Sequence, residues 1–154
     1  MLIIVEGISK VGKTALCNKL SERLNIPILI KERFGFVPQF ESMYANFGSS
    51  RMLLNLLNTC SDINLILDGF HLSERVYGLL DRYYDCVDYY NKIDEKLAEM
   101  EDVILFHVNP INIVESSKQY GMDLEPYYIM FKKLFNNSKI KNKLECDYTT
   151  INKI

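Results

Sequence analysis

Short apolar runs alternate with longer segments of helical periodicity along the chain. The apolar runs are continuous, as expected for strands buried on both faces, and they cover 2–6, 28–30, 63–67 and 103–108. Apolar residues that recur every three or four positions predict helices over 13–24, 40–59, 72–84, 88–100, 111–120 and 125–135. A last strand is expected within 144–151. The alternation predicts one α/β domain, residues 1–154, with a parallel sheet that carries helices on both faces.

A glycine-rich turn joins the first expected strand to the first expected helix. It reads Gly7-Ile8-Ser9-Lys10-Val11-Gly12-Lys13-Thr14, the residue types and spacing of a P-loop. Glycines let backbone N–H groups converge on phosphate oxygens, and the positive end of the following helix adds to the attraction. An incidental glycine-rich turn is the alternative interpretation, and the strand before the motif and the helix after it count against that alternative. The motif therefore predicts a site for a nucleoside triphosphate.

The residue types of this turn assign roles to its members. Lys13 is expected to reach the β- and γ-phosphates as a catalytic residue, and Thr14 to offer its hydroxyl to Mg²⁺. The expected ATP contacts are Gly7, Ser9, Lys10, Val11, Gly12, Lys13, Thr14 and Ala15. The expected cofactors are accordingly ATP and Mg²⁺.

Polar residues stand where the expected strands end, at Glu6, Lys31-Glu32, Asp68 and Asn109. In open parallel sheets ligands bind at the carboxyl ends of the strands. Asp68 follows a buried strand, which is where an acidic residue holds magnesium beside a P-loop. The alternative is that Asp68 caps the next helix. We favour a metal site made by Thr14 and Asp68.

Composition limits the classes of function. The net charge of −2 argues against a protein that coats duplex nucleic acid, which normally carries a strong basic excess. The four cysteines have no CxxC spacing, so a zinc site is not expected and the thiols are expected to be reduced. No secretory signal is visible, and no apolar run approaches the roughly 20 residues that span a bilayer. A cytoplasmic protein without a membrane partner is therefore expected.

Aromatic residues follow the second expected strand, near Arg33 and Arg51. They are Phe34, Phe36, Phe40, Tyr44 and Phe47. Flat apolar walls beside a few polar groups suit a nucleobase, which favours Phe34 and Phe36 as site residues. Phe40 and Phe47 lie at helical spacing and are better explained as core. His71 is either an acceptor contact or a packing residue, and His107, inside a strand, is expected to be a hydrogen-bonded core residue.

The motifs resemble those of thymidylate kinases and the related deoxynucleoside kinases, especially small phage-type members. The resemblance rests on Val5-Glu6-Gly7-Ile8 with Gly12-Lys13-Thr14, on Ile30-Lys31-Glu32-Arg33, on the segment 67–78, and on Cys146-Asp147-Tyr148-Thr149 near the adenine side. It implies a P-loop NTPase three-layer sandwich with strand order 2-3-1-4-5. It also implies phosphoryl transfer from ATP to a deoxynucleoside or its monophosphate, a short lid around 115–125, and in many relatives a homodimer.

The resemblance also implies roles on the acceptor side. Glu32 would be the catalytic base on a sugar hydroxyl or would help to order the magnesium and the acceptor, and Asp68 would lie beside the metal and the acceptor. The acceptor contacts implied or suggested by position are Lys31, Arg33, Phe34, Phe36, Arg51, Phe70, His71 and Arg75.

The sequence departs from the family pattern around the phosphates. Ser9 and Lys10 stand where aspartate and glycine are usual, and Gly69 stands where an arginine is usual. The segment 111–137 contains no arginine, although such kinases clamp the transferring phosphate with lid arginines. We hypothesise that Arg75 and Lys10 replace the missing arginines. Two alternative functions follow: a weakly active or inactive nucleotide-binding protein, and a kinase that acts on a hydroxyl within DNA.

Overall fold

The computed structural model describes residues 1–30, 39–60, 62–84 and 86–151. In chain order the elements are β1 (Leu2–Glu6), α1 (Lys13–Leu24), β2 (Ile28–Ile30), α2 (Gln39–Thr59), β3 (Leu65–Asp68), α3 (His71–Leu80), α4 (Val87–Glu99), β4 (Val103–Asn109), α5 (Ile113–Tyr120), α6 (Glu125–Asn137), β5 (Asn142–Asp147) and α7 (Tyr148–Ile151). Of the expected acceptor segment, residues 31–38 lie outside the described residues.

The strands form one five-stranded sheet with the order β2-β3-β1-β4-β5, and every adjacent pair is parallel. The order implied by the family resemblance is therefore confirmed. Strand β1 lies at the centre, and its residues Leu2 to Glu6 are all buried, because helices cover both of its faces. The register pairs Val5 with Asp68 on one side and Glu6 with His107 on the other, which brings their carboxyl ends to one edge.

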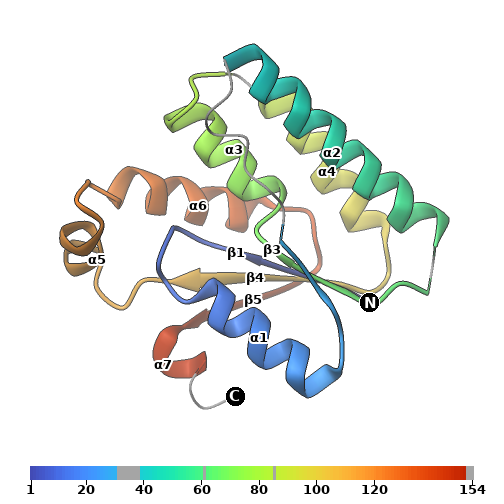
Figure 1. Ribbon diagram of the computed structural model, residues 1–154, viewed down its shortest axis with the longest axis horizontal. Helices are drawn as coiled ribbons and strands as arrows, with labels where there is room; N and C mark the ends of the chain where they lie inside the picture. Colours follow the sequence, from blue (N-terminus) through green and yellow to red (C-terminus); the bar gives the residue numbers. More distant parts are fainter. Residues whose placement is uncertain (31–38, 61, 85, 152–154) are drawn as a thin grey trace.

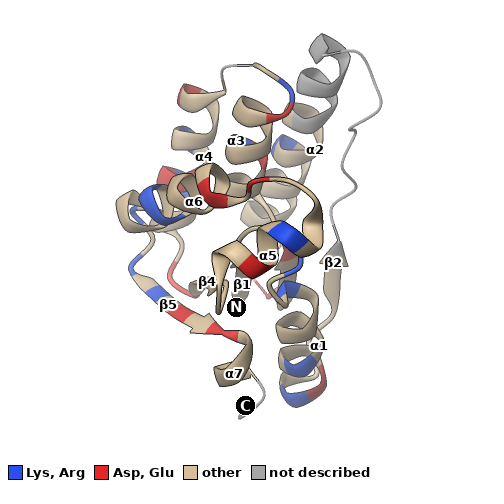
Figure 2. Cartoon of the chain, turned by 90° about the vertical axis from the view of Figure 1, so that its left-hand side faces the viewer, with Lys and Arg blue, Asp and Glu red and all other residues tan. Residues whose placement is uncertain are grey.

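Helices form a layer on each side of the sheet. Helices α1 and α7 lie on one face, and α2, α3, α4 and α6 lie on the other (Figure 1). Helix α5 stands at the edge where the strands end, in front of β1 and β4 in Figure 2. The expected three-layer arrangement is confirmed, and the P-loop and α5 meet at the same edge.

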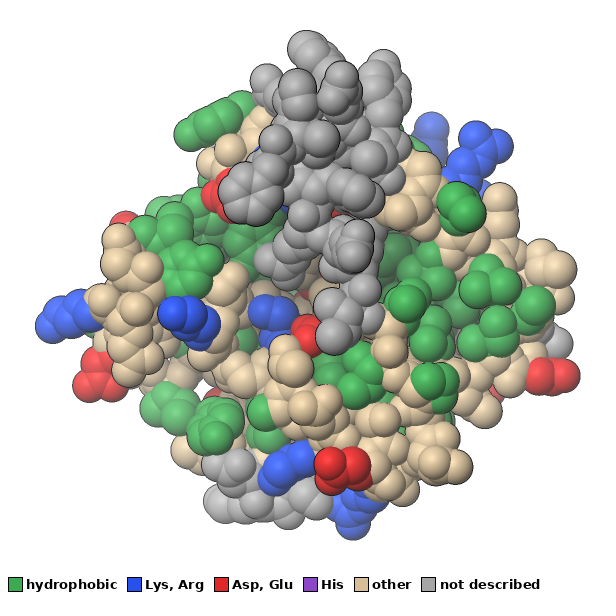
Figure 3. All heavy atoms as spheres, in the orientation of Figure 1, with side chains coloured by type: hydrophobic (Ala, Val, Ile, Leu, Met, Phe, Trp, Pro, Cys, Tyr) green, Lys and Arg blue, Asp and Glu red, His purple; other side chains and the backbone are tan. Residues whose placement is uncertain are grey.

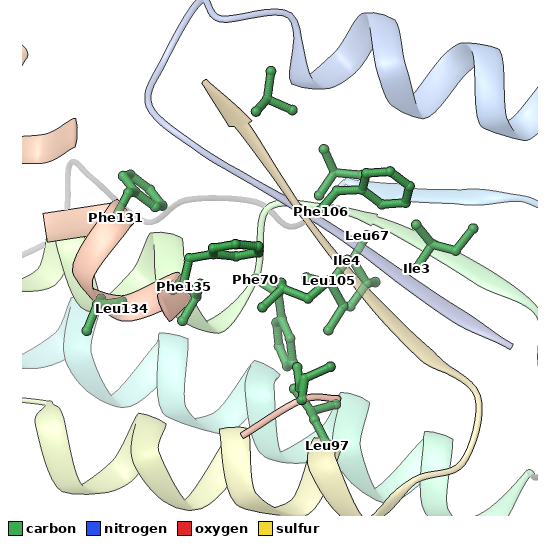
Figure 4. Close-up of a cluster of buried hydrophobic side chains, with 14 of the residues drawn as sticks. Ile3, Ile4, Leu67, Phe70, Leu97, Leu105, Phe106, Phe131, Leu134 and Phe135 are labelled. Atoms are coloured by element: carbon green, nitrogen blue, oxygen red, sulfur yellow. The ribbon is translucent and has the colours of Figure 1, made fainter. Parts of the chain in front are cut away.

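The core packs against both faces of the sheet, with Leu16 and Leu20 of α1 on one face and residues of the larger helical layer on the other. Phe70, Leu97, Leu105 and Phe131 are each at most 1% exposed. In Figure 4 the ring of Phe70 points into this cluster, towards Leu97 of α4. Phe47 packs beside this core, as expected, with its ring stacked on Tyr89 at a centroid distance of 4.0 Å.

Several boundaries differ from the expected ones. The segment after β5 was expected to continue as a strand, but Tyr148–Ile151 is a short helix. The reason is Asp147, whose Oδ1 accepts hydrogen bonds from the Thr149 hydroxyl at 2.6 Å and from Thr150 N at 2.8 Å. These bonds hold the pKa of Asp147 well below its ordinary value, at about 2. The side chain therefore ends the strand and starts a helix.

The acidic stretch around Asp94 was expected to be a solvated helix face, and for Asp94 this is wrong. Asp94 is only 8% exposed and is hydrogen-bonded within the protein. All four cysteines are free thiols, in agreement with the sequence. Within the described residues, no helix combines the length and apolarity that a membrane crossing needs. On the face in Figure 3, basic and acidic side chains are scattered rather than gathered into one patch.

Candidate active site at the carboxyl edge of the sheet

The glycine-rich turn runs between β1 and α1 and depends on its two glycines. Gly7 has φ +146° and Gly12 has φ +100°, conformations that L side chains rarely adopt. A Cβ atom on Gly7 would lie 2.6 Å from Val108 O, and one on Gly12 would lie 2.9 Å from the Tyr148 ring. Lys10 also has a positive φ, +61°, without being glycine. The turn is therefore held tightly against β4 and α7.

The lysine and threonine that end the turn point to two different partners. Lys13 is buried, and its Nζ donates to the carbonyl oxygen of Ile8 at 2.7 Å, so the ammonium lies inside the loop. Thr14 Oγ1 donates to Asp68 Oδ2 at 2.6 Å. The predicted partnership of Thr14 and Asp68 is thus present as a direct contact. Helix α3 has Phe70 as its N-cap, so the alternative that Asp68 caps this helix is wrong.

The other expected ATP contacts lie around the same turn. The Ser9 hydroxyl is 3.1 Å from the Tyr77 hydroxyl on α3. Lys10 is exposed, and its Nζ stands 5.3 Å from the ring centroid of Tyr120 on α5, a cation–π contact. Val11 is buried beneath the turn, and Ala15 is half-buried in the first turn of α1. Lys10 therefore links the loop to the segment expected to be a lid.

A cavity of about 390 Å³ opens beside the glycine-rich turn. Three parts of the chain line it: residues 10–12 of the loop, residues 110–112 with one side of α5, and Tyr148 on α7. Its polar side chains include those of Asn112, Glu115, Ser116 and Gln119. The Asn112 Oδ1 already accepts from Val114 N and Glu115 N as the cap of α5. The cavity thus offers one aromatic ring and several polar groups next to the loop.

Glu6 ends β1 at the edge of the site, and the sequence assigned it no role. It is fully buried, with an exposed fraction of 0%. Its Oε1 accepts from Phe70 N at 2.9 Å and Leu72 N at 3.0 Å, and its Oε2 accepts from Ser73 N at 3.1 Å and from the Ser73 hydroxyl. One signal was present in the sequence, since a charged residue ends an otherwise apolar strand.

The expected acceptor residues are only partly placed by the structure. Lys31, Glu32, Arg33, Phe34 and Phe36 lie outside the described residues.

The placed candidates do not gather at the phosphate loop. Phe70 and His71 are each 1% exposed, so neither side chain presents a surface to an acceptor. Arg51 is exposed on α2, where its charge lies near Tyr89. Arg75 Nη1 donates to Asn91 Oδ1 of α4 at 2.7 Å, so Arg75 faces the neighbouring helices. The hypothesis that Arg75 replaces a missing active-site arginine does not fit this position.

Two buried titratable groups near the site are unsuited to proton transfer. Burial raises the pKa of Cys17 to about 12, and the nearby charge of Asp68 adds to this, so the thiol stays protonated. Burial lowers the pKa of His107 to about 4. Neither ring nitrogen of His107 has a hydrogen-bond partner among the described residues, contrary to the expected hydrogen-bonded core histidine. Its ring stacks instead on Phe135, with centroids 5.2 Å apart.

Comparison with known proteins identifies the fold. No family model and no curated protein matches the chain. Among solved structures, the YorR protein of Bacillus subtilis, in complex with phosphorylated GDP, is similar with a TM-score of 0.70 and 22% identity over 96% of this chain and 85% of that one.

A second similar protein is a deoxyadenosine kinase from M. mycoides. With dCTP bound it has a TM-score of 0.52 and 18% identity, over 98% of this chain and 94% of that one. With the products dCMP and a flexible dCDP it has a TM-score of 0.54 and 19% identity, over 99% of this chain and 95% of that one. The chain therefore has the fold of these proteins, at identities too low to transfer a substrate.

Proposed function

We propose that this protein is a nucleotide-dependent phosphotransferase that moves the γ-phosphoryl group of ATP to a deoxynucleoside or a deoxynucleoside monophosphate. One observation carries the proposal. Lys13 and the Thr14–Asp68 pair stand together at the end of a P-loop, on the sheet edge where such folds bind ligands. The similarity of fold to a deoxyadenosine kinase is consistent with this choice of acceptor.

The loop is suited to a triphosphate because of the groups it presents. Backbone N–H groups between Gly7 and Thr14 and the amino end of α1 favour negative charge. Lys13 would exchange its bond to the Ile8 carbonyl for one to a phosphate oxygen. Lys10 contacts Tyr120 of the proposed lid from the loop and would act on the transferring phosphate in place of an arginine.

Magnesium fits the oxygen atoms at the end of the loop. The Thr14 hydroxyl and the Asp68 carboxylate are hard oxygen ligands, and Mg²⁺ in such sites keeps several waters and uses only one or two protein groups. When bound, Mg²⁺ would neutralise phosphate charge; Thr14 and Asp68 would hold it.

The 390 Å³ cavity is the proposed site for the donor base. Tyr148 offers a flat ring, and the exposed amide of Gln119 and the remaining N–H groups of Asn112 offer polar contacts. The proposed lid comprises α5 and the turn at Gly121. On the acceptor side we retain Glu32 as base, with Lys31, Arg33, Phe34 and Phe36 as contacts. Phe70 and His71 are left out because they are buried. Arg75 is left out because it bonds to Asn91 of α4, and Arg51 because its charge lies near Tyr89 of α4.

A panel assay tests the proposal. ATP consumption is measured with each deoxynucleoside and each deoxynucleoside monophosphate in turn, and products are identified by mass spectrometry. We expect one acceptor class to raise consumption and Lys13→Met to abolish the increase. Lys19→Met is the matched control, because Lys19 lies on the same helix and donates to Ile151 O. If no acceptor raises consumption above the level without acceptor, the proposed function is wrong.

A further inference from the structure

A buried carboxylate holds the start of helix α3 against the end of β1. Glu6 accepts three backbone N–H groups and one hydroxyl from residues 70–73, and no Lys or Arg side chain forms an ion pair with it among the described residues. A buried charge without a cation is costly unless hydrogen bonds and a helix dipole offset it. Glu6 has both, so its charge is tied to the position of this helix end.

The same contacts fix the turn that carries Asp68. Gly69 N donates to Val5 O at 2.9 Å, and Phe70 N donates to Glu6 Oε1 at 2.9 Å. Consecutive residues after Asp68 are therefore bonded to the last two residues of β1. Gly69 itself has φ +80°, a conformation that favours glycine. The turn that follows Asp68 is thus bonded to Glu6, although no hydrogen bond joins the side chains of Glu6 and Asp68 among the described residues.

A second buried carboxylate holds the other side of the same helix end. The His71 ring lies between the two acids. Its Nε2 is 2.9 Å from Asp94 Oδ1, whereas its Nδ1 is 4.0 Å from Glu6 Oε1 and has no hydrogen-bond partner among the described residues, so Glu6 and His71 are neighbours without a hydrogen bond. Asp94 also accepts from the Ser138 hydroxyl at 2.6 Å and from Lys139 N at 2.7 Å. Burial by itself would raise the pKa of Asp94, but the hydrogen bonds from His71, Ser138 and Lys139 N outweigh it and hold the pKa below its ordinary value. Asp94 is therefore ionised, and His71 Nε2 donates to it.

We infer that Glu6, His71 and Asp94 form a buried relay of positioning residues that fixes the turn Asp68–Gly69 from outside the active site. The relay runs from the end of β1, through the first turn of α3, to α4 and the turn between α6 and β5. Its role in metal binding rests on the proposed function, because Asp68 is the proposed magnesium ligand. All three side chains are buried, so each would act through the backbone of residues 68–73 and not by contact with a nucleotide.

Two measurements test the relay on the full chain. The first is amide hydrogen exchange of the peptide that covers residues 67–72. The second is the gain in affinity for a non-hydrolysable ATP analogue on adding Mg²⁺, measured by calorimetry. For Glu6→Gln and His71→Leu we expect exchange to rise and the Mg²⁺-dependent gain to fall, each by about tenfold, the lower end of the range for residues that orient metal ligands. Binding of the analogue without Mg²⁺ should change little.

Matched variants separate positioning from general stability. His71→Gln keeps an N–H donor for Asp94. Its amide exchange and its Mg²⁺-dependent gain in affinity should therefore be closer to those of the unmodified protein than those of His71→Leu are. Asp81→Asn weakens the bond from the Tyr127 hydroxyl at the far end of the same helix. It should change neither the amide exchange of residues 67–72 nor the Mg²⁺-dependent gain in affinity.

The remaining outcomes test the relay, its part in metal binding and the proposed function separately. Unchanged exchange in Glu6→Gln and His71→Leu, or equal changes in Asp81→Asn, would overturn the relay. Raised exchange with an unaltered Mg²⁺-dependent gain would overturn its part in metal binding. If the unmodified protein gains no affinity from Mg²⁺, the proposed function fails, and the exchange data still decide whether the relay fixes the turn.

Discussion

The Thr14 hydroxyl donates a 2.6 Å hydrogen bond to Asp68 Oδ2, joining the first turn of α1 to the end of β3 across 54 positions of sequence. Removing either group leaves the proposed Mg²⁺ with one protein ligand fewer. We expect Asp68→Asn and Thr14→Val to lower the Mg²⁺-dependent affinity for an ATP analogue by about 10- to 100-fold. Calorimetry with and without Mg²⁺ measures this. Thr59→Val is the control, because the Thr59 hydroxyl donates to Asn55 O at the end of α2, away from the proposed metal site. Equal losses in all three variants would contradict the metal role.

Alanine substitutions at Gly12 and Gly121 should separate steric contact from backbone strain. At Gly12 a Cβ would meet the Tyr148 ring at 2.9 Å with φ at +100°, whereas at Gly121 nothing lies within 4 Å and φ is +77°. Gly121→Ala therefore adds only backbone strain, on the order of 1 kcal/mol. We expect it to keep nucleotide affinity while the melting temperature falls slightly. Gly12→Ala should lower both the nucleotide affinity and the melting temperature. Adding Tyr148→Ala should recover part of the melting temperature but not the affinity, because Tyr148 is the proposed contact of the donor base; a melting temperature that does not recover would show that backbone strain alone acts at Gly12.

The sequence was sufficient for the parts of the site that local chemistry determines. The apolar run before Gly7 and the helical spacing after Lys13 place the loop between a strand and a helix, and the buried run before Asp68 places this acid on the neighbouring strand. Parallel pairing of β1 with β3 then brings the two together, because parallel strands share one carboxyl edge.

The sequence was insufficient to predict which neighbouring element a helical side chain contacts. Arg75 is two positions from Tyr77, about 200° around the helix, so when Tyr77 meets Ser9 of the loop, Arg75 must face away. The burial of Asp94 depends on His71 and Ser138, which come from two other segments. The contact of Lys10 with Tyr120 likewise joins residues far apart in sequence. Such partners follow from packing, which periodicity alone does not specify.

His107 makes stability depend on pH. Its pKa is lowered by burial to about 4, from an ordinary 6.5, so the unfolded chain takes up the proton first as the pH falls. The contribution of neutral His107 to the free energy of unfolding is therefore fully present above pH 6.5 and is lost as the pH falls from 6.5 to 4. The total loss is about 3 kcal/mol, at about 1.4 kcal/mol per unit of pKa. Chemical denaturation across this range should show the loss. In His107→Phe, which removes two buried nitrogens without partners, the slope should be smaller; an unchanged slope would contradict this assignment.

Lys10 should be required for turnover and not for stability. It holds φ +61° without being glycine, a conformation that costs roughly 1 kcal/mol, and its ammonium faces Tyr120 at the proposed lid. Lys10→Gly relieves the strain and removes the charge. We therefore expect an unchanged or higher melting temperature together with turnover lower by about 100-fold, less than the loss of an arginine finger can cost.

A second lysine gives the control for Lys10. Lys118 lies on α5, the helix of the proposed lid that Lys10 contacts through Tyr120. It has no ion pair or hydrogen bond among the described residues, so Lys118→Met measures the effect of removing a positive charge near the site. We expect Lys118→Met to keep turnover within about threefold, since a lone exposed charge contributes little. Tyr120→Leu should preserve the ammonium but free it from the ring, raising KM for ATP more than it lowers kcat. If Lys10→Gly and Lys118→Met reduce turnover equally, Lys10 contributes only to the overall positive charge near the site and does not act directly on the transferring phosphate.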